Sequence, residues 1–285
     1  MTVLRATAHA KLNLTLDVLN KRPDGYHDLR MVMQEIALGD EITLTLNTGE
    51  GWRVTSESGE IPCDARNLAV KAAKLFFETA ELDPYGLTID IKKVTPVMAG
   101  MGGGSADGAA VLRLLQKYYG NPLPERTLYH LAEETGSDVP FALFGGTALA
   151  EGKGQVLTRL PSMPDCRIVL CKPAFPVSTP ALFRAVDQEE IKARPDTNAM
   201  LTALEAGSLS GIAAALGNVF APIIFREHPE MVEIQRALLE YGALGVAMTG
   251  SGPTMFGLFS DEIAAEAAYS SLKQHYADTF LTEPV

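Results

Sequence analysis

The sequence predicts an α+β fold, in which strands and helices are mixed along the chain. Two segments, residues 12–18 and 87–91, alternate apolar and polar side chains, which is typical of strands with one buried face. Two others, residues 67–78 and 109–115, space their apolar side chains as a helix does. Because the segments lack the regular strand–helix repeat of a doubly wound sheet, we favour α+β over that fold.

Length and composition predict a globular protein of one large or two ordinary domains. The chain has 285 residues, of which 47% are hydrophobic and 21% charged, so it can bury a substantial core. Pro161 and Pro164 flank a short polar stretch. We therefore expect one domain over residues 1–160 and a second over residues 161–285.

The first predicted domain opens with a strand at residues 11–18, which Pro23-Asp24-Gly25 ends in a hairpin-like turn. The same periodicities predict its remaining elements. These are strands at 31–36, 42–46, 87–92 and 144–150, and helices at 67–78, after residue 105, and at 124–134, the last of which Gly136 closes.

The second predicted domain holds three apolar, strand-like segments, at residues 168–171, 245–248 and 256–259. A Gly-rich turn, Thr249-Gly250-Ser251-Gly252-Pro253-Thr254, separates the last two. The charged stretch from residue 187 to residue 196 is typical of a solvated helix or loop, and we prefer this interpretation to a functional role.

Charge and cysteine usage exclude several classes of function. The net charge of −11 leaves no basic excess to neutralise a nucleic-acid backbone, so we expect no nucleic acid as a partner. Cys63, Cys166 and Cys171 are widely spaced and form no metal-ligand pattern, which favours reduced thiols and a cytoplasmic location. No segment has the length of a membrane span or the pattern of a signal peptide, so we expect no membrane partner either.

The most informative segment is residues 96–107, Pro-Val-Met-Ala-Gly-Met-Gly-Gly-Gly-Ser-Ala-Asp. It joins a strand to a helix, and its glycines leave backbone N–H groups uncovered at the positive end of the helix dipole. Such a loop can cradle a phosphate. It lacks the Lys-Ser/Thr of the Walker pattern and the last glycine of the dinucleotide pattern. The alternative is an ordinary Gly-rich strand-to-helix turn.

Three segments in this order resemble the GHMP kinase family (galactose, homoserine, mevalonate and phosphomevalonate kinases). They are the polar strand face with Lys11 and Asn13, the Gly-rich loop, and the late turn at residues 249–254. The resemblance covers essentially the whole chain. It implies a two-domain GHMP kinase fold, with a ribosomal-protein-S5-domain-2-like N-terminal half that binds ATP and an α/β ferredoxin-like C-terminal half.

Within the family, four motifs are similar to those of members that phosphorylate a cytidyl diphosphate alcohol in the non-mevalonate route to isoprenoid precursors. They are residues 10–14 (Ala-Lys-Leu-Asn-Leu), 22–29 (Arg-Pro-Asp-Gly-Tyr-His-Asp-Leu), 136–140 (Gly-Ser-Asp-Val-Pro) and 178–183 (Ser-Thr-Pro-Ala-Leu-Phe). The resemblance implies ATP-dependent phosphorylation of the 2-hydroxyl of that alcohol, with Mg²⁺ as the metal.

For the reaction centre, the resemblance implies Asp138 and Lys11. Asp138 would take the proton from the substrate hydroxyl or orient that hydroxyl, and Lys11 would keep this carboxylate ionised and stabilise developing charge. Ser105 would hydrogen-bond a phosphate or help to hold the metal. The alternatives are a helix N-cap for Asp138, ahead of Pro140, and a solvated strand residue for Lys11.

For the acceptor, the resemblance implies that Tyr26, His27 and Phe183 recognise cytosine, with Asn13 and Thr179 as further substrate contacts. Two aromatic rings can sandwich a pyrimidine, worth ~1–3 kcal/mol per stacked base, and an imidazole can hydrogen-bond the base edge. The alternatives are a ligand-free pair beside the turn for Tyr26 and His27, and a core position for Phe183.

For ATP, the resemblance implies contacts on both sides of the Gly-rich loop. The positions are Asn67, Lys93, Pro96, Gly100, Gly102, Gly103, Gly104, Ser105 and Ala106. Asn67 is equally well explained as a helix N-cap. Gly250, Ser251 and Gly252 form the turn that closes over the active site in the family.

Two alternative functions remain open. One is a GHMP kinase for another small alcohol, such as mevalonate or homoserine, which gives no reason for the set of Tyr26, His27 and Phe183. The other is a catalytically silent nucleotide-binding member, which has no need of Lys11 and Asp138 together. The expected ligands are therefore ATP, Mg²⁺ and a small cytidyl diphosphate substrate, bound by a monomer or homodimer.

Overall fold

The computed structural model describes residues 1–49, 51–188, 191 and 193–285, which form two compact units. The first unit comprises Met1–Ala10, Leu38–Val97 and Gly102–Gly145, and the second comprises Lys11–Ala37, Met98–Met101 and Gly146–Val285. Two strands of 20 residues, β1 (Thr2–Lys21) and β2 (His27–Leu46), contribute to both units. Each unit is thus discontinuous in sequence, whereas the predicted domains 1–160 and 161–285 are continuous; that division stays a prediction.

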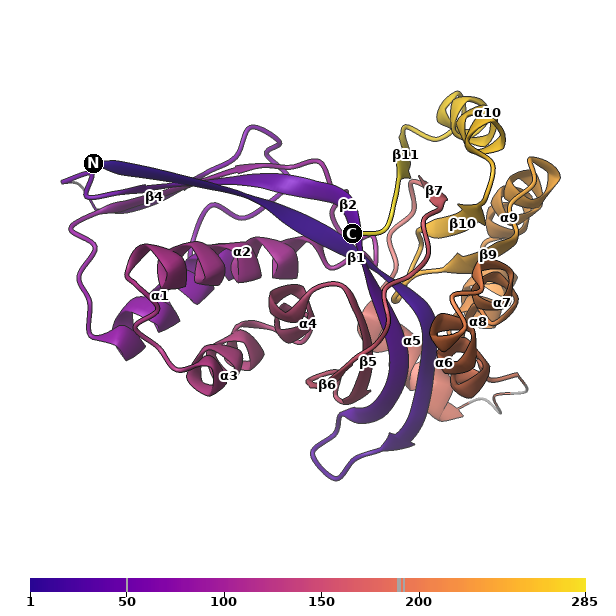
Figure 1. Ribbon diagram of the computed structural model, residues 1–285, viewed down its shortest axis with the longest axis horizontal. Helices are drawn as coiled ribbons and strands as arrows, with labels where there is room; N and C mark the ends of the chain where they lie inside the picture. The colour runs from indigo at the N-terminus through magenta and orange to yellow at the C-terminus, as the bar shows by residue number, and fades with distance from the viewer. Residues whose placement is uncertain (50, 189–190, 192) are drawn as a thin grey trace. The chain divides into compact units, whose positions relative to one another are not determined.

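Over its described residues, the first unit packs four helices against a sheet. In the sheet, β2 pairs antiparallel with β4 (Leu87–Lys92), and β4 pairs parallel with β3 (Trp52–Thr55). Figure 1 shows two of the helices side by side against these strands. The helices are α1 (Leu68–Ala80), α2 (Gly103–Tyr118), α3 (Glu125–Thr135) and α4 (Val139–Phe144).

The alternation and helical spacing in the sequence explain the core of the first unit. Ile89 and Ile91 of β4 are buried together with Leu112 and Leu115 of α2 and Phe76 of α1. These are the apolar positions on which the strand and helix predictions rested, and both elements are confirmed. Because this face of α2 is buried, the orientation of the helix is fixed, and with it the orientation of the N–H groups at its N-terminus.

The second unit contains two sets of strands. In one, β2 pairs antiparallel with β5 (Thr147–Gly152), β5 pairs with β6 (Val156–Arg159), and β1 pairs parallel with β8 (Gly217–Asn218). The other is an antiparallel sheet in the order β11-β7-β10-β9. Its members are β7 (Arg167–Lys172), β9 (Gly245–Met248), β10 (Met255–Phe259) and β11 (Asp278–Thr282).

Among its described residues, the second unit also has six helices. They are α5 (Thr179–Gln188), α6 (Thr197–Glu205), α7 (Leu209–Ala214), α8 (Ala221–Glu227), α9 (Glu230–Glu240) and α10 (Glu262–Lys273). Over the part of the chain that the structure describes, none of the helices is long and apolar enough to cross a membrane.

Three local predictions need correction or completion. The two strands predicted at 31–36 and 42–46 are one strand, because Gly39 lets the backbone of Ala8 approach so closely that a Cβ at 39 would lie 2.6 Å from its carbonyl oxygen. The strand predicted from residue 144 begins at Thr147, since Phe144 ends α4 and Gly145 has φ +69°. Of the charged stretch, residues 189, 190 and 192 lie outside the described residues.

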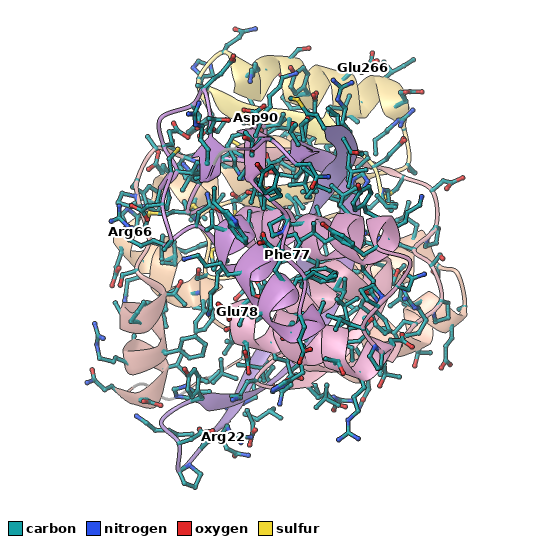
Figure 2. The ribbon with its side chains drawn as sticks, turned by 90° about the vertical axis from the view of Figure 1, so that its left-hand side faces the viewer. Arg22, Arg66, Phe77, Glu78, Asp90 and Glu266 are labelled. Atoms are coloured by element: carbon teal, nitrogen blue, oxygen red, sulfur yellow. The ribbon has the colours of Figure 1, made fainter. Side chains whose placement is uncertain are left out.

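The turn predicted at Pro23-Asp24-Gly25 joins β1 to β2. The backbone N–H of Arg22 donates to the carbonyl of Tyr26 at 2.7 Å, and Gly25 takes φ +84°. Arg22 lies at this turn (Figure 2) and donates to Asp28 at 2.7 Å. The turn places Tyr26 and His27 at the start of β2.

Candidate active site

The Gly-rich loop enters α2 without a side-chain cap. Gly102 precedes the helix with φ +68° and, having no side chain, supplies no capping acceptor. A Cβ at Gly103 would lie 3.0 Å from Cγ2 of Thr95, so glycine lets the helix start close to the end of β4. The N–H groups of the first turn are therefore open to an anion, as a phosphate cradle requires.

The earlier half of the loop, Met98–Met101, packs against the late turn within the second unit. A Cβ at Gly100, which has φ +73°, would lie 2.4 Å from the carbonyl oxygen of Thr249. A Cβ at Gly250 would lie 2.5 Å from the carbonyl oxygen of Gly100. Glycine at both positions is thus required by the close approach of two backbones that are far apart in sequence.

Thr249, to which no sequence pattern assigned a role, connects three of the sequence motifs. Its hydroxyl accepts from the backbone N–H of Asn13 at 2.9 Å and donates to the carbonyl of Gly100 at 3.4 Å. The side chain is fully buried. The one signal in the sequence was a polar residue directly before Gly250-Ser251-Gly252. Its two hydrogen-bond partners lie far away along the chain, so the sequence did not reveal them.

We expect Thr249→Val to lower the free energy of unfolding by about 1–3 kcal/mol, because the isosteric methyl leaves the N–H of Asn13 without its acceptor. Urea unfolding measures this value. Thr249→Ser keeps the hydroxyl and serves as the control. Equal unfolding midpoints for Thr249→Val and the wild type would contradict this role of the hydroxyl.

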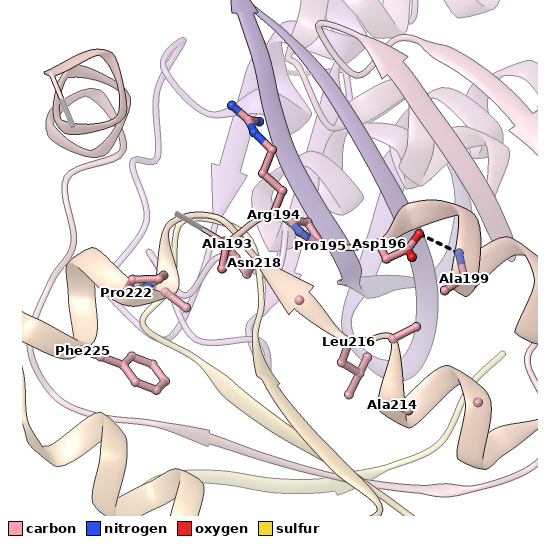
Figure 3. A pocket seen from close by; sticks show the side chains of 14 residues that line it. Ala193, Arg194, Pro195, Asp196, Ala199, Ala214, Leu216, Asn218, Pro222 and Phe225 are labelled. Carbon is pink, nitrogen blue, oxygen red and sulfur yellow. Dashed lines mark hydrogen bonds between the residues drawn. The ribbon is translucent and has the colours of Figure 1, made fainter. Parts of the chain in front are cut away.

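Asn218 holds the same turn from the other side, and no sequence pattern assigned it a role either. Its amide Nδ2 donates to the carbonyls of Met248 and Gly250, both at 2.8 Å, and its Oδ1 accepts from the N–H of Phe220. Asn218 also lines a cavity of about 610 Å³ beside β8, where Asp196 accepts from the N–H of Ala199 (Figure 3). None of the predicted site residues is among the described residues that line this cavity.

Lys11 and Asn13 share one face of β1, as their spacing predicts. The ammonium of Lys11 donates to Oδ1 of Asn13 at 2.5 Å, and both side chains are buried. The backbone N–H of Lys11 donates to the carbonyl of Met101 at 3.0 Å. β1 therefore fixes the end of the Gly-rich segment that belongs to the second unit.

His27 and Phe183 stack on each other, with ring centroids 4.8 Å apart and an interplanar angle of 22°. Phe183 also meets Phe220 edge to face. Tyr26 is 60% exposed, and the ammonium of Lys153 lies 5.0 Å from its ring centroid. Of the three predicted cytosine contacts, His27 and Phe183 of α5 are thus in direct contact, and Tyr26 lies in the same unit.

Asp187 joins His27, although its charged neighbours in the sequence favoured a solvated position. Its Oδ1 lies 2.7 Å from Nε2 of His27, and its Oδ2 accepts from the ammonium of Lys21 at 2.5 Å. These two partners, Lys21 first, lower the pKa of Asp187 below its ordinary value. An ionised carboxylate only accepts, so Nε2 of His27 carries a proton and donates it to Asp187.

Thr179 meets the closing turn. Its hydroxyl donates to Oγ of Ser251 at 2.8 Å, from the first residue of α5. Phe183 follows one helical turn later, on the same helix. α5 therefore links the predicted cytosine contacts to the turn at residues 249–252.

Asp138 precedes α4 in the first unit, but its side chain makes no capping hydrogen bond to that helix. Its backbone is near-helical, with φ −93° and ψ −5°, and Pro140 lies in the first turn of α4. The capping alternative raised by the sequence is thus not what the structure shows.

Asn67 and Lys93 use their side chains locally. Asn67 is the N-cap of α1: its Oδ1 accepts from the N–H of Ala69, and its Nδ2 donates to the carbonyl of Pro62, both at 2.9 Å. The ammonium of Lys93 is bound by Asp40 and Asp107. Direct contacts from these side chains to ATP stay predictions.

The predicted site residues fall in both units. The first unit carries Asn67, Lys93, Pro96, Gly102, Gly103, Gly104, Ser105, Ala106 and Asp138, and the second carries Lys11, Asn13, Tyr26, His27, Gly100, Thr179, Phe183, Gly250, Ser251 and Gly252. Within the described ranges there is no group of three or more His, Cys, Asp or Glu side chains that could hold a metal ion.

Comparison with known families finds two matching models. The GHMP kinases N terminal domain matches residues 67–146, which include the Gly-rich loop and Asp138. The GHMP kinases C terminal model matches residues 200–278, which include the turn at 249–252.

Curated relatives match over nearly the whole chain. A 4-diphosphocytidyl-2-C-methyl-D-erythritol kinase of Clostridium kluyveri is 40% identical over 278 residues, covering 98% of this chain and 99% of the relative. The protein of the same name from Pelotomaculum thermopropionicum is 45% identical over 259 residues, covering 91% and 90% of the two chains.

Solved structures give the same result for the fold. The crystal structure of a 4-(cytidine 5'-diphospho)-2C-methyl-D-erythritol kinase superposes with a TM-score of 0.83 at 33% identity, covering 99% of both chains. A homoserine kinase from Cytophaga hutchinsonii has a TM-score of 0.80 at 20% identity, covering 100% of this chain and 95% of its own, and supports the fold alone. The family models and the curated relatives together show that this chain belongs to the GHMP kinase family.

Proposed function

We propose that this chain is a small-molecule kinase that transfers a phosphoryl group from ATP to the 2-hydroxyl of 4-diphosphocytidyl-2-C-methyl-D-erythritol. The observation that carries the proposal is the 40–45% identity, over nearly the full length, to curated kinases named for this substrate. The stacked pair of His27 and Phe183 supports the cytidyl part of the assignment, because aromatic faces and a hydrogen-bonding edge can recognise a pyrimidine.

The start of α2 fits the phosphates of ATP. Its first turn is uncapped and glycine-lined, so backbone N–H groups and the helix dipole can face an anion. Mg²⁺, when bound, would neutralise charge on the transferring phosphates. Magnesium keeps several waters and binds through substrate phosphates and, usually, one or two carboxylates; the one protein contact we assign to it is the hydroxyl of Ser105.

We assign the reaction centre to Asp138 and Lys11. Asp138, whose side chain does not cap α4, would accept the proton of the substrate hydroxyl or orient that hydroxyl. Lys11 would stabilise negative charge that develops on the reacting oxygen, while Asn13 fixes its ammonium at 2.5 Å. Phosphoryl transfer depends mostly on such positioning and electrostatics.

For the base, we assign hydrogen bonding to His27. With the proton on Nε2, its Nδ1 can accept from the exocyclic amino group of cytosine, whereas the corresponding oxygen of uracil offers no proton. The residue would thus favour cytidyl over uridyl substrates. Thr179 and Asn13 are proposed as further substrate contacts.

The test is ADP release with Mg-ATP and 4-diphosphocytidyl-2-C-methyl-D-erythritol, with mevalonate and homoserine as competing acceptors. We expect turnover of the cytidyl alcohol alone. Turnover of mevalonate or homoserine instead would remove the cytosine assignment. ATP binding without turnover of any acceptor would favour a catalytically silent member of the family.

Asp187 gives a sharper test of the acceptor side. We expect Asp187→Ala to raise KM for the cytidyl substrate by roughly 3- to 10-fold, because His27 loses the partner that fixes its tautomer. The values of kcat and of KM for ATP should be unchanged. Asp28→Ala, which removes a neighbouring ion pair to Arg22, is the matched control. An unchanged acceptor KM in Asp187→Ala would exclude this role.

A further inference from the structure

Three charged side chains are buried together in the first unit, and the proposed mechanism uses none of their charges. Asp40 of β2 is fully buried, Asp107 of α2 is 2% exposed, and the side chain of Lys93, just after β4, is 6% exposed. The ammonium of Lys93 lies 2.5 Å from Oδ2 of Asp40 and 3.1 Å from Oδ2 of Asp107. Buried charges are costly, so such a cluster calls for a reason.

The cluster ties together the two ends of the Gly-rich loop. On the strand side, Oδ1 of Asp40 accepts from the backbone N–H of Val94 at 2.6 Å and of Thr95 at 2.8 Å. On the helix side, Asp107 lies in the second turn of α2, whose first residue is Gly103. A Cβ at Gly103 would lie 3.3 Å from the ammonium of Lys93. One ammonium therefore fixes the end of β4 and the start of α2.

The charges within the cluster do not balance when both carboxyl groups are ionised. Asp40 receives two N–H groups and the ammonium, whereas Asp107 receives the ammonium alone, and its Oδ1 is buried without a partner among the described residues. Burial raises the pKa of Asp107 to about 7; Lys93 acts against this rise and the charge of Asp40 adds to it. Lys93 and Asp40 are the charged groups that face it. The cluster is thus neutral with Asp107 protonated and carries a negative charge above that pH.

We propose that Asp40, Lys93 and Asp107 are positioning residues for the nucleotide, which hold the end of β4 and the first turns of α2 at the separation that presents the N–H groups of residues 103–105 to a phosphate. The inference rests on the proposed ATP-dependent function. It assigns to Lys93 a role inside the protein, because its ammonium is enclosed by two carboxylates.

Calorimetric titration with Mg-ADP tests the inference without any acceptor. We expect Lys93→Met to raise the Kd for ADP by roughly 10-fold or more and to leave KM for the acceptor unchanged. Asp40→Asn is the second variant in case Lys93→Met does not fold, because its amide oxygen can still accept from Val94 and Thr95. Leu115→Ala, a fully buried core change on the same helix, is the control for simple destabilisation.

The expected result is weaker ADP binding in Lys93→Met and Asp40→Asn, and wild-type binding in Leu115→Ala despite its lower unfolding temperature. Wild-type affinity in both charge variants, or an equal loss in Leu115→Ala, would overturn the inference. If the variants lose ADP affinity and no acceptor is phosphorylated, the inference stands and the proposed acceptor fails. If the wild type binds no ADP, both fall.

Asp107→Asn adds a readout that a merely structural role would not move. At about pH 6, where Asp107 is protonated, the variant should bind ADP as the wild type does. At about pH 8.5 the wild type carries an extra buried negative charge beside the cradle, so its Kd should exceed that of the variant. A Kd ratio that does not change with pH would contradict the role of Asp107.

Discussion

Replacing Asp138 with asparagine is expected to lower kcat by a factor of roughly 10²–10⁴, which is the contribution of a positioned general base. Asparagine keeps the shape of the side chain but cannot take a proton. Because Asp138 makes no capping hydrogen bond to α4, the exchange removes no helix cap. Steady-state ADP release gives kcat, and thermal unfolding of the same sample verifies the fold.

Asp261 offers a matched control, since it precedes a helix in the same way but does cap it. Its carboxylate accepts from the N–H groups of Ile263 and Ala264 at the start of α10. Asp261→Ala should therefore cost about 1 kcal/mol of stability and leave kcat unchanged. If Asp138→Asn instead loses stability and keeps its kcat, the carboxylate is structural and the proposed reaction centre is wrong.

Replacing Gly100 with alanine is expected to lower the free energy of unfolding by about 2–5 kcal/mol. The φ of +73° costs an L-residue about 1–2 kcal/mol, and a Cβ 2.4 Å from the carbonyl oxygen of Thr249 forces two backbone segments apart. Urea unfolding at constant m-value measures the loss.

Gly25→Ala separates the two contributions. Gly25 has φ +84°, but a Cβ there meets nothing within 4 Å, so its cost should stay near about 1–2 kcal/mol. The excess in Gly100→Ala is then the contact between the loop and the turn at residues 249–252. Equal losses in the two variants would show that this contact has no energetic weight.

Hydrophobic periodicity predicted the strands and helices well where its apolar residues form the core. The alternation at residues 87–91 and the helical spacing at 109–115 follow directly from which side chains face the interior, so β4 and α2 were predictable. Gly39 was not: it lies in a gap between two short apolar runs, and its use became clear only from the backbone of Ala8 that it approaches.

The residues that support the site could not be predicted from the sequence, because their hydrogen-bond partners are far away along the chain. Thr249 bonds Asn13 across 236 positions, and Asp187 bonds His27 across 160. Asp40 lies between two predicted strands, where a charged residue is expected to be solvated. It is nevertheless fully buried, because its carboxylate accepts hydrogen bonds from the ammonium of Lys93 and from two backbone N–H groups. Periodicity carries no information on such pairings.

The sharing of β1 and β2 between both units has a consequence for synthesis on the ribosome. Residues 11–37 leave the ribosome first, but their partners in the second unit come from residues 146–285. The hydroxyl that meets Asn13 is translated 236 residues later, on the order of 10–50 s at ordinary elongation rates. The strand that carries Lys11 therefore cannot complete its contacts in the second unit until Thr249 has been synthesised, so this part of the second unit forms late.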